Sequence, residues 1–453
     1  MFKRASRRPV LLCVCALAAC AWAFLPPGAG VVRGPARVVF DEEKLDAALQ
    51  RAARAALAGR DGAVLVLDAQ TGRLRAAVNS RLAFEEAFPP GSTVKPFTTL
   101  AALRSGAVGE HSRSFCPGLY DRQGLTIRCS HPRLKPPFNL TRALAYSCNH
   151  FFAQVGEGLN ENVFTQTLDS YGFGARTGAG GPRESGGQLP RGPWKTAHAL
   201  GAVPQMLVTP AQLVAAYVAL FNGGRLYAPS RGAARGFVPA ERGRTEVPAA
   251  HRALLVEGMR GAIAYGTAER AGLSSVDAFV FGKTGTATAP EDFRTTHGWF
   301  VGLASDAGAN SQASPDAVRL AVLVFLKRAT GGEAAEVSRA IFEEYSAATQ
   351  RRGDAETRRS DEARLGDEGE REGENGGDEQ GATVVSDSAY GSNPGGGRNV
   401  DDESNLDDES NPSDDSHSHR SDSSSHPPGA SPRHRVPASH VRVRVSRADS
   451  VLS

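Results

Sequence analysis

The stretch FVFGKTGTATAPEDFRTTHGWFVGLA, residues 279–304, indicates most directly how the chain folds. It holds two apolar runs, 279–287 and 298–304, which are rich in the aromatic and β-branched residues that favour strands. A third apolar run follows at 318–327, and a helical pattern at 333–348 comes after it. The chain is therefore expected to end its folded part with three strands and one helix.

The same elements are expected near the start of the folded part. Residues 41–58 form an amphipathic pattern with an acidic first turn, which predicts a helix, and the apolar runs 63–68 and 74–78 flank a turn and predict a β-hairpin. The stretch 92–264 is mostly helical in pattern, most clearly at 211–222. We therefore predict an α+β fold: an antiparallel sheet, completed by distant parts of the chain and flanked by helices, with a large all-helical insert.

The composition changes near residue 350. From Arg351 onward the chain has 13 basic and 22 acidic residues, many Gly and Ser, and few aromatic residues. Such a segment buries too little apolar surface to offset the entropy cost of ordering. We expect one folded domain at 36–349, a disordered acidic tail at 350–438, and a short, basic, strand-like end at 439–453.

The N-terminus has the pattern of an export signal. Four basic residues precede an uncharged, apolar stretch at 10–25, which is shorter than the roughly 20 residues of a membrane-spanning helix. The sequence LAAC, ending at Cys20, resembles a bacterial lipobox, and AWA at 21–23 offers a cleavage site. Three interpretations of residues 1–25 stay open: a cleaved signal peptide, a lipoprotein signal with Cys20 lipidated, or an uncleaved anchor. All three place the rest of the chain outside the cytoplasm.

The charge pattern argues against a nucleic-acid partner. The 453-residue chain has a net charge of +3, and its basic residues are spread thinly rather than gathered in one stripe or helix. Arginine outnumbers lysine 45 to 7, so the position of each lysine carries more information than usual.

Three of the six cysteines lie in the predicted folded domain. Cys116 and Cys129 flank a 12-residue stretch, and outside the cytoplasm they could form a disulfide worth about 3 kcal/mol; two reduced thiols are the alternative. Cys148 stands alone. No CxxC spacing or His/Cys cluster along the sequence indicates a metal site.

The first chemical motif is PPGSTVKP, residues 89–96. Ser92 and Lys95 at the start of a helix lie on one face, one turn apart. A serine hydroxyl becomes a good nucleophile when a nearby base takes its proton, and a buried lysine near another cation can be that base. The helix N-terminus favours a developing oxyanion.

The second motif is Ser147-Cys148-Asn149. Its hydroxyl and amide, two residues apart, can face one cavity, where the hydroxyl could pass on a proton and the amide could hold a substrate backbone group.

The third motif is Lys283-Thr284-Gly285-Thr286, within the first predicted strand of the C-terminal group. Lysine with alternating hydroxyls suits a ligand that ends in a carboxylate, and Gly285 allows another backbone to approach closely. An extended substrate could pair along this strand edge. The residues alone thus predict a serine acyl-transfer site with a cationic carboxylate pocket.

The three motifs, in this order, resemble those of the penicillin-binding protein transpeptidases and serine β-lactamases: Ser-x-x-Lys, Ser-x-Asn and Lys-Thr-Gly. They are separated by 55 and then 136 residues. Residues 64–72, 209–213 and 298–302 also resemble this family, and the likeness extends over about residues 40–348.

The resemblance implies a role for each motif residue. Ser92 would be the acylated nucleophile and Lys95 its base, while Ser147 would relay a proton and Asn149 would contact the substrate. Lys283 and Thr286 would bind the substrate carboxylate, with the N–H groups of Ser92 and Thr286 as the oxyanion hole.

The implied reaction is the transfer of a D-alanyl-D-alanine-ended stem peptide of peptidoglycan to an acceptor amine, with β-lactams as mimics and no cofactor. The implied location is the bacterial cell envelope, with membrane attachment through the N-terminus. Cell-division or elongation proteins are the implied partners.

Two features depart from the family. Only 91 residues precede Ser92, which suggests a short form without a glycosyltransferase domain or long N-terminal pedestal. The stretch GAVPQ at 201–205 stands where relatives usually have Gly-Gln-Gly.

Two alternative functions stay open. A β-lactamase or penicillin sensor would need a water-activating group, for which Glu161 near Asn160 is a poor substitute. A non-catalytic cell-wall scaffold would use the acidic tail for interaction, but such a protein usually loses one of the three motifs. Water as acceptor, which would give a D,D-carboxypeptidase, cannot be separated from cross-linking by the motifs.

Overall fold

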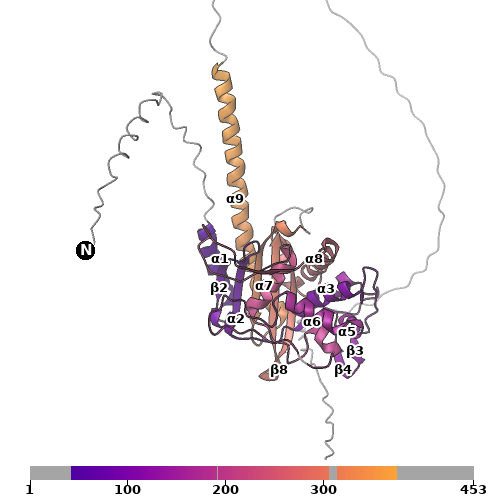
Figure 1. The fold of residues 1–453 in the computed structure, drawn as a ribbon. Coiled ribbons are helices and arrows are strands. Elements are labelled where there is room, and N and C mark those ends of the chain that lie inside the picture. The colour runs from indigo at the N-terminus through magenta and orange to yellow at the C-terminus, as the bar shows by residue number, and fades with distance from the viewer. Residues whose placement is uncertain (1–41, 191, 306–313, 375–453) are drawn as a thin grey trace, which may run out of the picture.

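The computed structural model describes residues 42–190, 192–305 and 314–374, and these residues form a mixed α+β domain (Figure 1). Its centre is a five-stranded antiparallel sheet in the order β2-β1-β9-β8-β7. Strands from both ends of the domain therefore lie side by side, as the sequence predicts. The strands are β1 (Gly62–Asp68), β2 (Leu74–Val78), β7 (Phe279–Ala289), β8 (Asp292–Ser305) and β9 (Val318–Leu326).

The two faces of the sheet are covered by different parts of the chain. One face packs against the N-terminal helix α1 (Glu42–Leu57) and the C-terminal helix α9 (Gly331–Glu374), with Val64, Phe300 and Ile341 in the apolar core between them. The other face packs against the helical insert, around the fully buried helix α7 (Pro210–Phe221). Each strand can serve two cores because successive side chains point to opposite faces.

The insert carries most of the helices. Thr209 caps α7 by accepting the N–H of Gln212, and Pro210 occupies the first helical position, as the sequence predicts. The remaining helices and 3₁₀ turns up to β7 are α2 (Ser80–Glu85), η1 (Gly91–Val94), α3 (Lys95–Ser105), α4 (Leu140–Ala145), α5 (Asn149–Gly158), α6 (Glu161–Ser170), η2 (Thr196–Leu200), α8 (Ala249–Ala264), η3 (Glu269–Ala271) and η4 (Leu273–Ser275); η6 (Pro315–Ala317) precedes β9.

The insert differs from the all-helical prediction in one respect, because it also contains two small hairpins. One pairs β3 (Leu119–Arg122) with β4 (Leu125–Arg128), and the other pairs β5 (Arg225–Tyr227) with β6 (Glu241–Arg244). These strands are only three or four residues long, which is too short for a period-2 pattern to stand out, and all of β6 is exposed.

Helix α9 continues past its predicted end near residue 348 as far as Glu374, so residues 350–374 of the segment expected to be disordered are helical. It begins with a capping box between Thr330 and Glu333. The extension is rich in Arg and Glu, which are good helix formers and can pair at i,i+4 spacing. In Figure 1 this part of α9 projects away from the rest of the domain.

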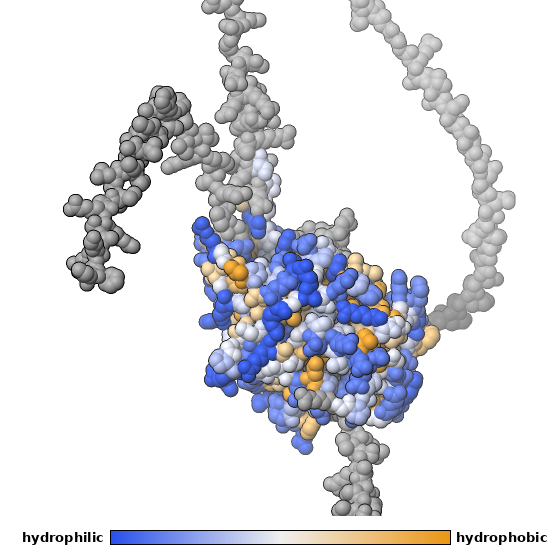
Figure 2. Space-filling model, in the orientation of Figure 1, coloured by the Kyte–Doolittle hydropathy of each residue, from blue (hydrophilic) through white to orange (hydrophobic). Residues whose placement is uncertain are grey.

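The outer surface is mostly hydrophilic in the view of Figure 2, with hydrophobic residues scattered over it. Within the described ranges, no helix combines the length and apolarity needed to cross a membrane. The predicted export signal at 1–25, with Cys20, and the predicted segment at 439–453 lie outside the described residues, as does the rest of the acidic tail beyond 374.

Candidate active site

Ser92 lies on the short turn η1, which leads directly into α3. Three hydrogen bonds hold this turn: the Thr93 hydroxyl donates to Pro90 O at 2.7 Å, Tyr217 Oη donates to Thr93 O at 2.7 Å, and Trp299 Nε1 donates to Pro89 O at 3.0 Å. The residues on both sides of Ser92 are buried, while Ser92 itself is half-buried. The turn therefore presents one hydroxyl from a rigid support.

The Ser92 turn packs directly against the main chain of β7. A Cβ atom on Gly285 would lie 2.7 Å from Thr93 Cγ2 and 2.9 Å from Pro90 O. Gly91 has φ +52°, and a Cβ there would lie 2.9 Å from Thr286 O. Such distances are too short for a real Cβ, so glycine at both positions lets the nucleophile turn approach the strand.

Lys95 is fully buried one turn after Ser92. Its Nζ donates to Ser147 O at 2.7 Å, to Ser147 Oγ at 3.1 Å and to Asn149 Oδ1 at 2.8 Å. The ammonium also lies 5.3 Å from the centre of the Phe152 ring. Ser147 and Asn149 lie 52 and 54 residues after Lys95 in the chain, so the first two motifs meet at the Lys95 amine.

Ser147 lies between α4 and α5 with φ +52°, a left-handed conformation that is uncommon for a residue other than glycine. Its hydroxyl receives hydrogen bonds from both motif lysines, since Lys283 Nζ donates to Ser147 Oγ at 3.0 Å. Lys283 also donates to Thr284 O at 2.9 Å and is fully buried. Strain of this kind persists where the surrounding structure enforces it and is often found at functional sites.

Two buried amines therefore share one hydroxyl, and the hydrogen bonds found for them in the described chain all run to neutral oxygens. Burial lowers the pKa of Lys95 from 10.5 to about 8, although the nearby Cys148 and Cys129 thiols act in the opposite direction. Burial, and then the charge of Lys95, lowers the pKa of Lys283 well below its usual value. An amine with a pKa near 8 can accept a proton from a neighbouring hydroxyl at a physiological pH.

The side chains of the third motif point to opposite sides of β7. Lys283 faces Ser147, whereas the Thr284 hydroxyl donates to Thr267 Oγ1 at 2.6 Å. Thr286 is exposed, and its hydroxyl accepts the N–H of Gly331 at 2.9 Å. Strand β7 ends the order of the sheet and pairs only with β8 in the described structure, so its outer edge is open to an extended ligand.

The structure thus brings the predicted residues of all three motifs together, and it adds some that the sequence did not indicate. The Ser92 hydroxyl itself forms no hydrogen bond with the described residues, and catalytic hydrogen bonds often tighten only when substrate binds. Gly201, in the departing stretch GAVPQ, has φ +62°, and a Cβ there would lie 2.3 Å from Gly91 O. Neither this approach nor the Tyr217 hydrogen bond has a local sequence signal, because each joins segments more than 100 residues apart.

Cys116 and Cys129 are close enough to make the predicted disulfide geometrically accessible. Their Sγ atoms lie 3.5 Å apart, and all three cysteines of the domain are free thiols in this structure. The disulfide stays a prediction.

A serine, two buried lysines and a second serine thus gather beside β7, the edge strand of the sheet. A sequence model of the penicillin binding protein transpeptidase domain matches residues 62–343, which is more than half of the chain. The chain belongs to the penicillin-binding protein transpeptidase family.

Individual relatives agree with this assignment. The peptidoglycan D,D-transpeptidase MrdA of Escherichia coli K12 is 28% identical over 186 residues, which cover 33% of this chain and 29% of that protein. The crystal structure of Pseudomonas aeruginosa PBP2 in complex with WCK 5153 has a TM-score of 0.56 and 25% identity over 66% of this chain and 74% of that one. PBP2 from Helicobacter pylori, solved in complex with MreC, has a TM-score of 0.55 and 20% identity over 66% and 62% of the two chains, and it shows the shared fold. The match to MrdA thus spans less than a third of that protein.

Proposed function

We propose that the protein is a peptidoglycan D,D-transpeptidase that acylates itself at Ser92 and binds penicillin. One observation carries the proposal: two fully buried lysines from separate motifs converge on Ser147 Oγ, beside the rigid turn that presents Ser92. Lysine pairs of this kind are costly to bury without carboxylate partners, so a purely structural role does not account for them.

In the proposed first step, Ser92 Oγ attacks the carbonyl carbon between the two D-alanines of a stem peptide, while Lys95 Nζ takes the hydroxyl proton. The N–H groups of Ser92 and Thr286 stabilise the negative charge that develops on the carbonyl oxygen. The C–N bond then breaks, and the departing D-alanine takes a proton that Ser147 relays from the lysine. An ester on Ser92 and free D-alanine result.

In the second step, an amine of a neighbouring stem peptide attacks this ester, gives up its proton through the same groups and releases Ser92. The unpaired edge of β7 supports this assignment, because it can hold the extended donor peptide by backbone pairing. Lys283 and Thr286 would bind the terminal carboxylate, and Asn149 would contact the peptide backbone. Water in place of the amine would give carboxypeptidase activity.

The location and partners are proposed from the sequence and from relatives. The signal pattern at 1–25 supports the bacterial cell envelope, outside the cytoplasm, with attachment to the membrane by the N-terminus. H. pylori PBP2 forms a complex with MreC, and an association with proteins of a cell-elongation or cell-division complex is proposed here by analogy.

A labelling experiment with fluorescent penicillin tests this function. The full-length protein, solubilised in mild detergent, is incubated with the drug beside Ser92→Ala and beside Ser112→Ala, a serine outside the site. We expect a stable adduct mapped to Ser92, absent only from Ser92→Ala. Destruction of the drug without an adduct would indicate a β-lactamase. Folded protein that forms no adduct and does not consume the drug would favour a non-catalytic scaffold instead.

The donor and acceptor can then be tested with a D-alanyl-D-alanine-ended pentapeptide, with and without an amine acceptor. A cross-linked product identifies a transpeptidase, and release of D-alanine without cross-linking identifies a carboxypeptidase.

A further inference from the structure

Strand β7 has an outer edge that is open over only part of its length. Along its first half, Arg260 Nη1 from α8 donates to Val280 O at 2.8 Å. The Thr284 hydroxyl donates to Thr267 Oγ1, in the segment that follows α8, at 2.6 Å. From Gly285 to Ala289, β7 pairs with β8 alone among the described strands. This stretch of backbone is therefore left for a further strand to pair with.

The two faces of this open stretch differ in chemistry. On one face, the Cβ of Ala287 lies beside the nucleophile turn, since a Cβ on Gly91 would lie 3.2 Å from it. On the other face, Thr286 is exposed, and its hydroxyl accepts the N–H of Gly331 at the start of α9. One face is thus small and apolar, while the other is polar and adjoins α9.

A hollow of about 290 Å³ adjoins the polar face of the open stretch. It lies between the segment that contains Thr267 and the first turns of α9. Two exposed carboxylates, those of Glu333 and Glu336, line it together with one exposed arginine, Arg270. The side of the edge that faces α9 is therefore acidic on balance.

Residues 441–445, Val-Arg-Val-Arg-Val, have the complementary alternation. They lie outside the described residues, in the segment that the sequence predicts to be basic and strand-like. Successive side chains of a strand point to opposite faces, so the valines would share one face and the arginines the other. Along the open stretch of β7, the valines would lie on the side of Ala287 and the arginines on the side of Glu333 and Glu336.

We propose that residues 441–445 add as a strand to the open edge of β7 within the same chain. Backbone pairing supplies most of the attraction, and Arg442 and Arg444 fix the register by facing the carboxylates of α9. The docked segment occupies the edge along which the donor peptide would extend, so it slows acylation of Ser92. This consequence rests on the proposed function, whereas the docking itself does not.

The chain between the two partners is long enough for this contact. Helix α9 has 44 residues and rises about 1.5 Å per residue, so Glu374 lies about 66 Å from Gly331, which contacts β7. Residues 375–440 separate the helix from the segment. A flexible chain of that length has a typical end-to-end distance of about 45 Å and can extend to about 200 Å. The tether therefore keeps the segment at an effective concentration on the order of 0.1 mM, at which a short strand binds reversibly.

Amide hydrogen exchange of the full-length protein in mild detergent, followed by mass spectrometry, tests the docking. The test variant is Val443→Pro, because proline cannot donate a hydrogen bond to a strand ladder. The matched control is Val385→Pro, the same substitution elsewhere in the chain beyond α9. Both positions lie outside the described residues, so neither change removes a contact described for the domain.

The amides of residues 285–289 and 441–445 should exchange at least about threefold more slowly in the wild type and in Val385→Pro than in Val443→Pro. Equal exchange at both segments in all three proteins would overturn the proposal. Slow exchange that is lost on about 20-fold dilution would also overturn it, because a second copy would then be the partner.

Penicillin labelling of the same proteins tests the competition. Val443→Pro should be acylated about two- to fivefold faster than Val385→Pro, because the edge is no longer shared. Equal labelling rates in the presence of slow exchange would overturn the competition. If exchange shows the docking but no protein forms an adduct, the docking stands and only the proposed function falls. If adducts form at Ser92 without any slowed exchange, the proposed function stands and the docking falls.

Discussion

The domain buries two pairs of cations in opposite ways. Arg73, just before β2, and Arg75, on β2, are 5% and 7% exposed, and both contact carboxylates of α1. Arg75 Nε donates to Asp46 Oδ1 at 2.8 Å and Arg75 Nη2 donates to Glu42 Oε2 at 2.6 Å, while Arg73 also bonds to Asp46. Lys95 and Lys283 are 0% exposed and share a neutral hydroxyl.

The difference separates a structural site from a reactive one. A guanidinium keeps its charge, and the fork of donors on each arginine matches the carboxylates of α1, so the pair fastens the helix to the sheet. An ammonium buried among neutral oxygens can instead lose its proton, as the lowered pKa of Lys95 indicates. The partner of a buried cation, more than its burial, therefore distinguishes the two roles.

Removing the reactive amine should have the largest effect. Lys95→Ala is expected to lower the rate of penicillin acylation at Ser92 about 10³-fold, because the hydroxyl loses its base. The measurement is the second-order rate of adduct formation with intact, folded protein. Lys327→Ala, which removes a lysine in a partly exposed ion pair with Glu86, is the control and should change the rate less than about twofold. An equal loss in both variants would contradict the assignment of Lys95.

Breaking the paired cations should instead affect stability. Asp46→Ala removes the half-buried carboxylate that both Arg73 and Arg75 contact, and it is expected to lower the free energy of unfolding by about 3 kcal/mol. Chemical denaturation measures this change, and the acylation rate of the folded variant should stay within about twofold of wild type.

The control for this stability change is Arg81→Ala. Its side chain is 73% exposed, and its loss should cost no more than about 0.5 kcal/mol. If Asp46→Ala slowed acylation strongly while leaving stability intact, the division between structural and reactive cations would fail.

The reactive pair should also show itself in the pH dependence of acylation. Lys95 must be neutral to act as a base, so the rate should rise with pH and level off above its pKa of about 8. At pH 6 the neutral fraction would be about 100-fold below the plateau. Stopped-flow labelling between pH 6 and 9 measures this profile, and a rate that is flat across the range would exclude Lys95 as the base.

Much of this fold can be predicted from the sequence, because most of its strands are apolar runs bounded by turn residues. The runs 63–68, 74–78 and 318–327 appear as β1, β2 and β9 almost at their predicted bounds, since each is apolar and bounded by turn residues. Strand β8 begins at Asp292, earlier than the predicted 298, because residues 292–296 pair with β7 through backbone bonds although their side chains are exposed or half-buried.

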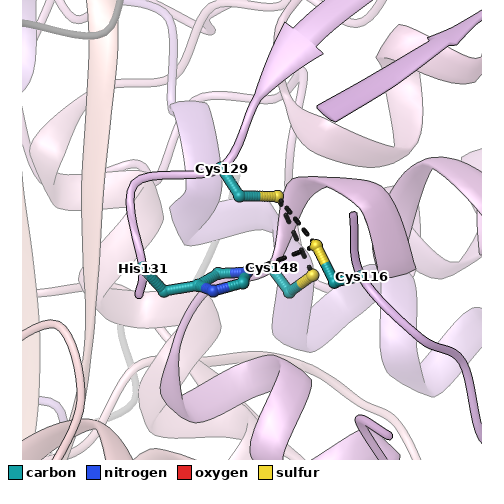
Figure 3. A group of neighbouring side chains, drawn as sticks. All are labelled: Cys116, Cys129, His131 and Cys148. Carbon is teal, nitrogen blue, oxygen red and sulfur yellow. Dashed lines mark hydrogen bonds between the residues drawn. The ribbon is translucent and has the colours of Figure 1, made fainter. Parts of the chain in front are cut away.

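The candidate site can be predicted from the sequence only in part. The sequence motifs identify Ser92, Lys95 and Lys283 as candidates. Contacts that join distant segments leave no local pattern in the sequence, so they cannot be predicted from it. Cys116, Cys129 and Cys148 illustrate this, since they come from three separate segments and their thiols meet only in the folded chain (Figure 3). Likewise, nothing in the order of residues shows that both lysines reach one hydroxyl.

The smallest expected effect concerns the backbone spacing on which the reactive pair depends. Gly285→Ala would place a Cβ 2.7 Å from Thr93 Cγ2 and force β7 away from the Ser92 turn. A shift of about 1 Å between nucleophile and substrate can cost up to about 100-fold in rate, and we expect a 10- to 100-fold loss of acylation with the paired arginines unaffected.

Gly243→Ala on β6 is the matched control, because a Cβ there meets nothing within 4 Å. It should leave the acylation rate within about twofold of wild type, and both variants should retain the circular dichroism of the folded domain. Full activity in Gly285→Ala would show that the strand and the nucleophile turn can separate without harm. The lysine pair would then depend on its side-chain contacts alone, as the arginine pair does.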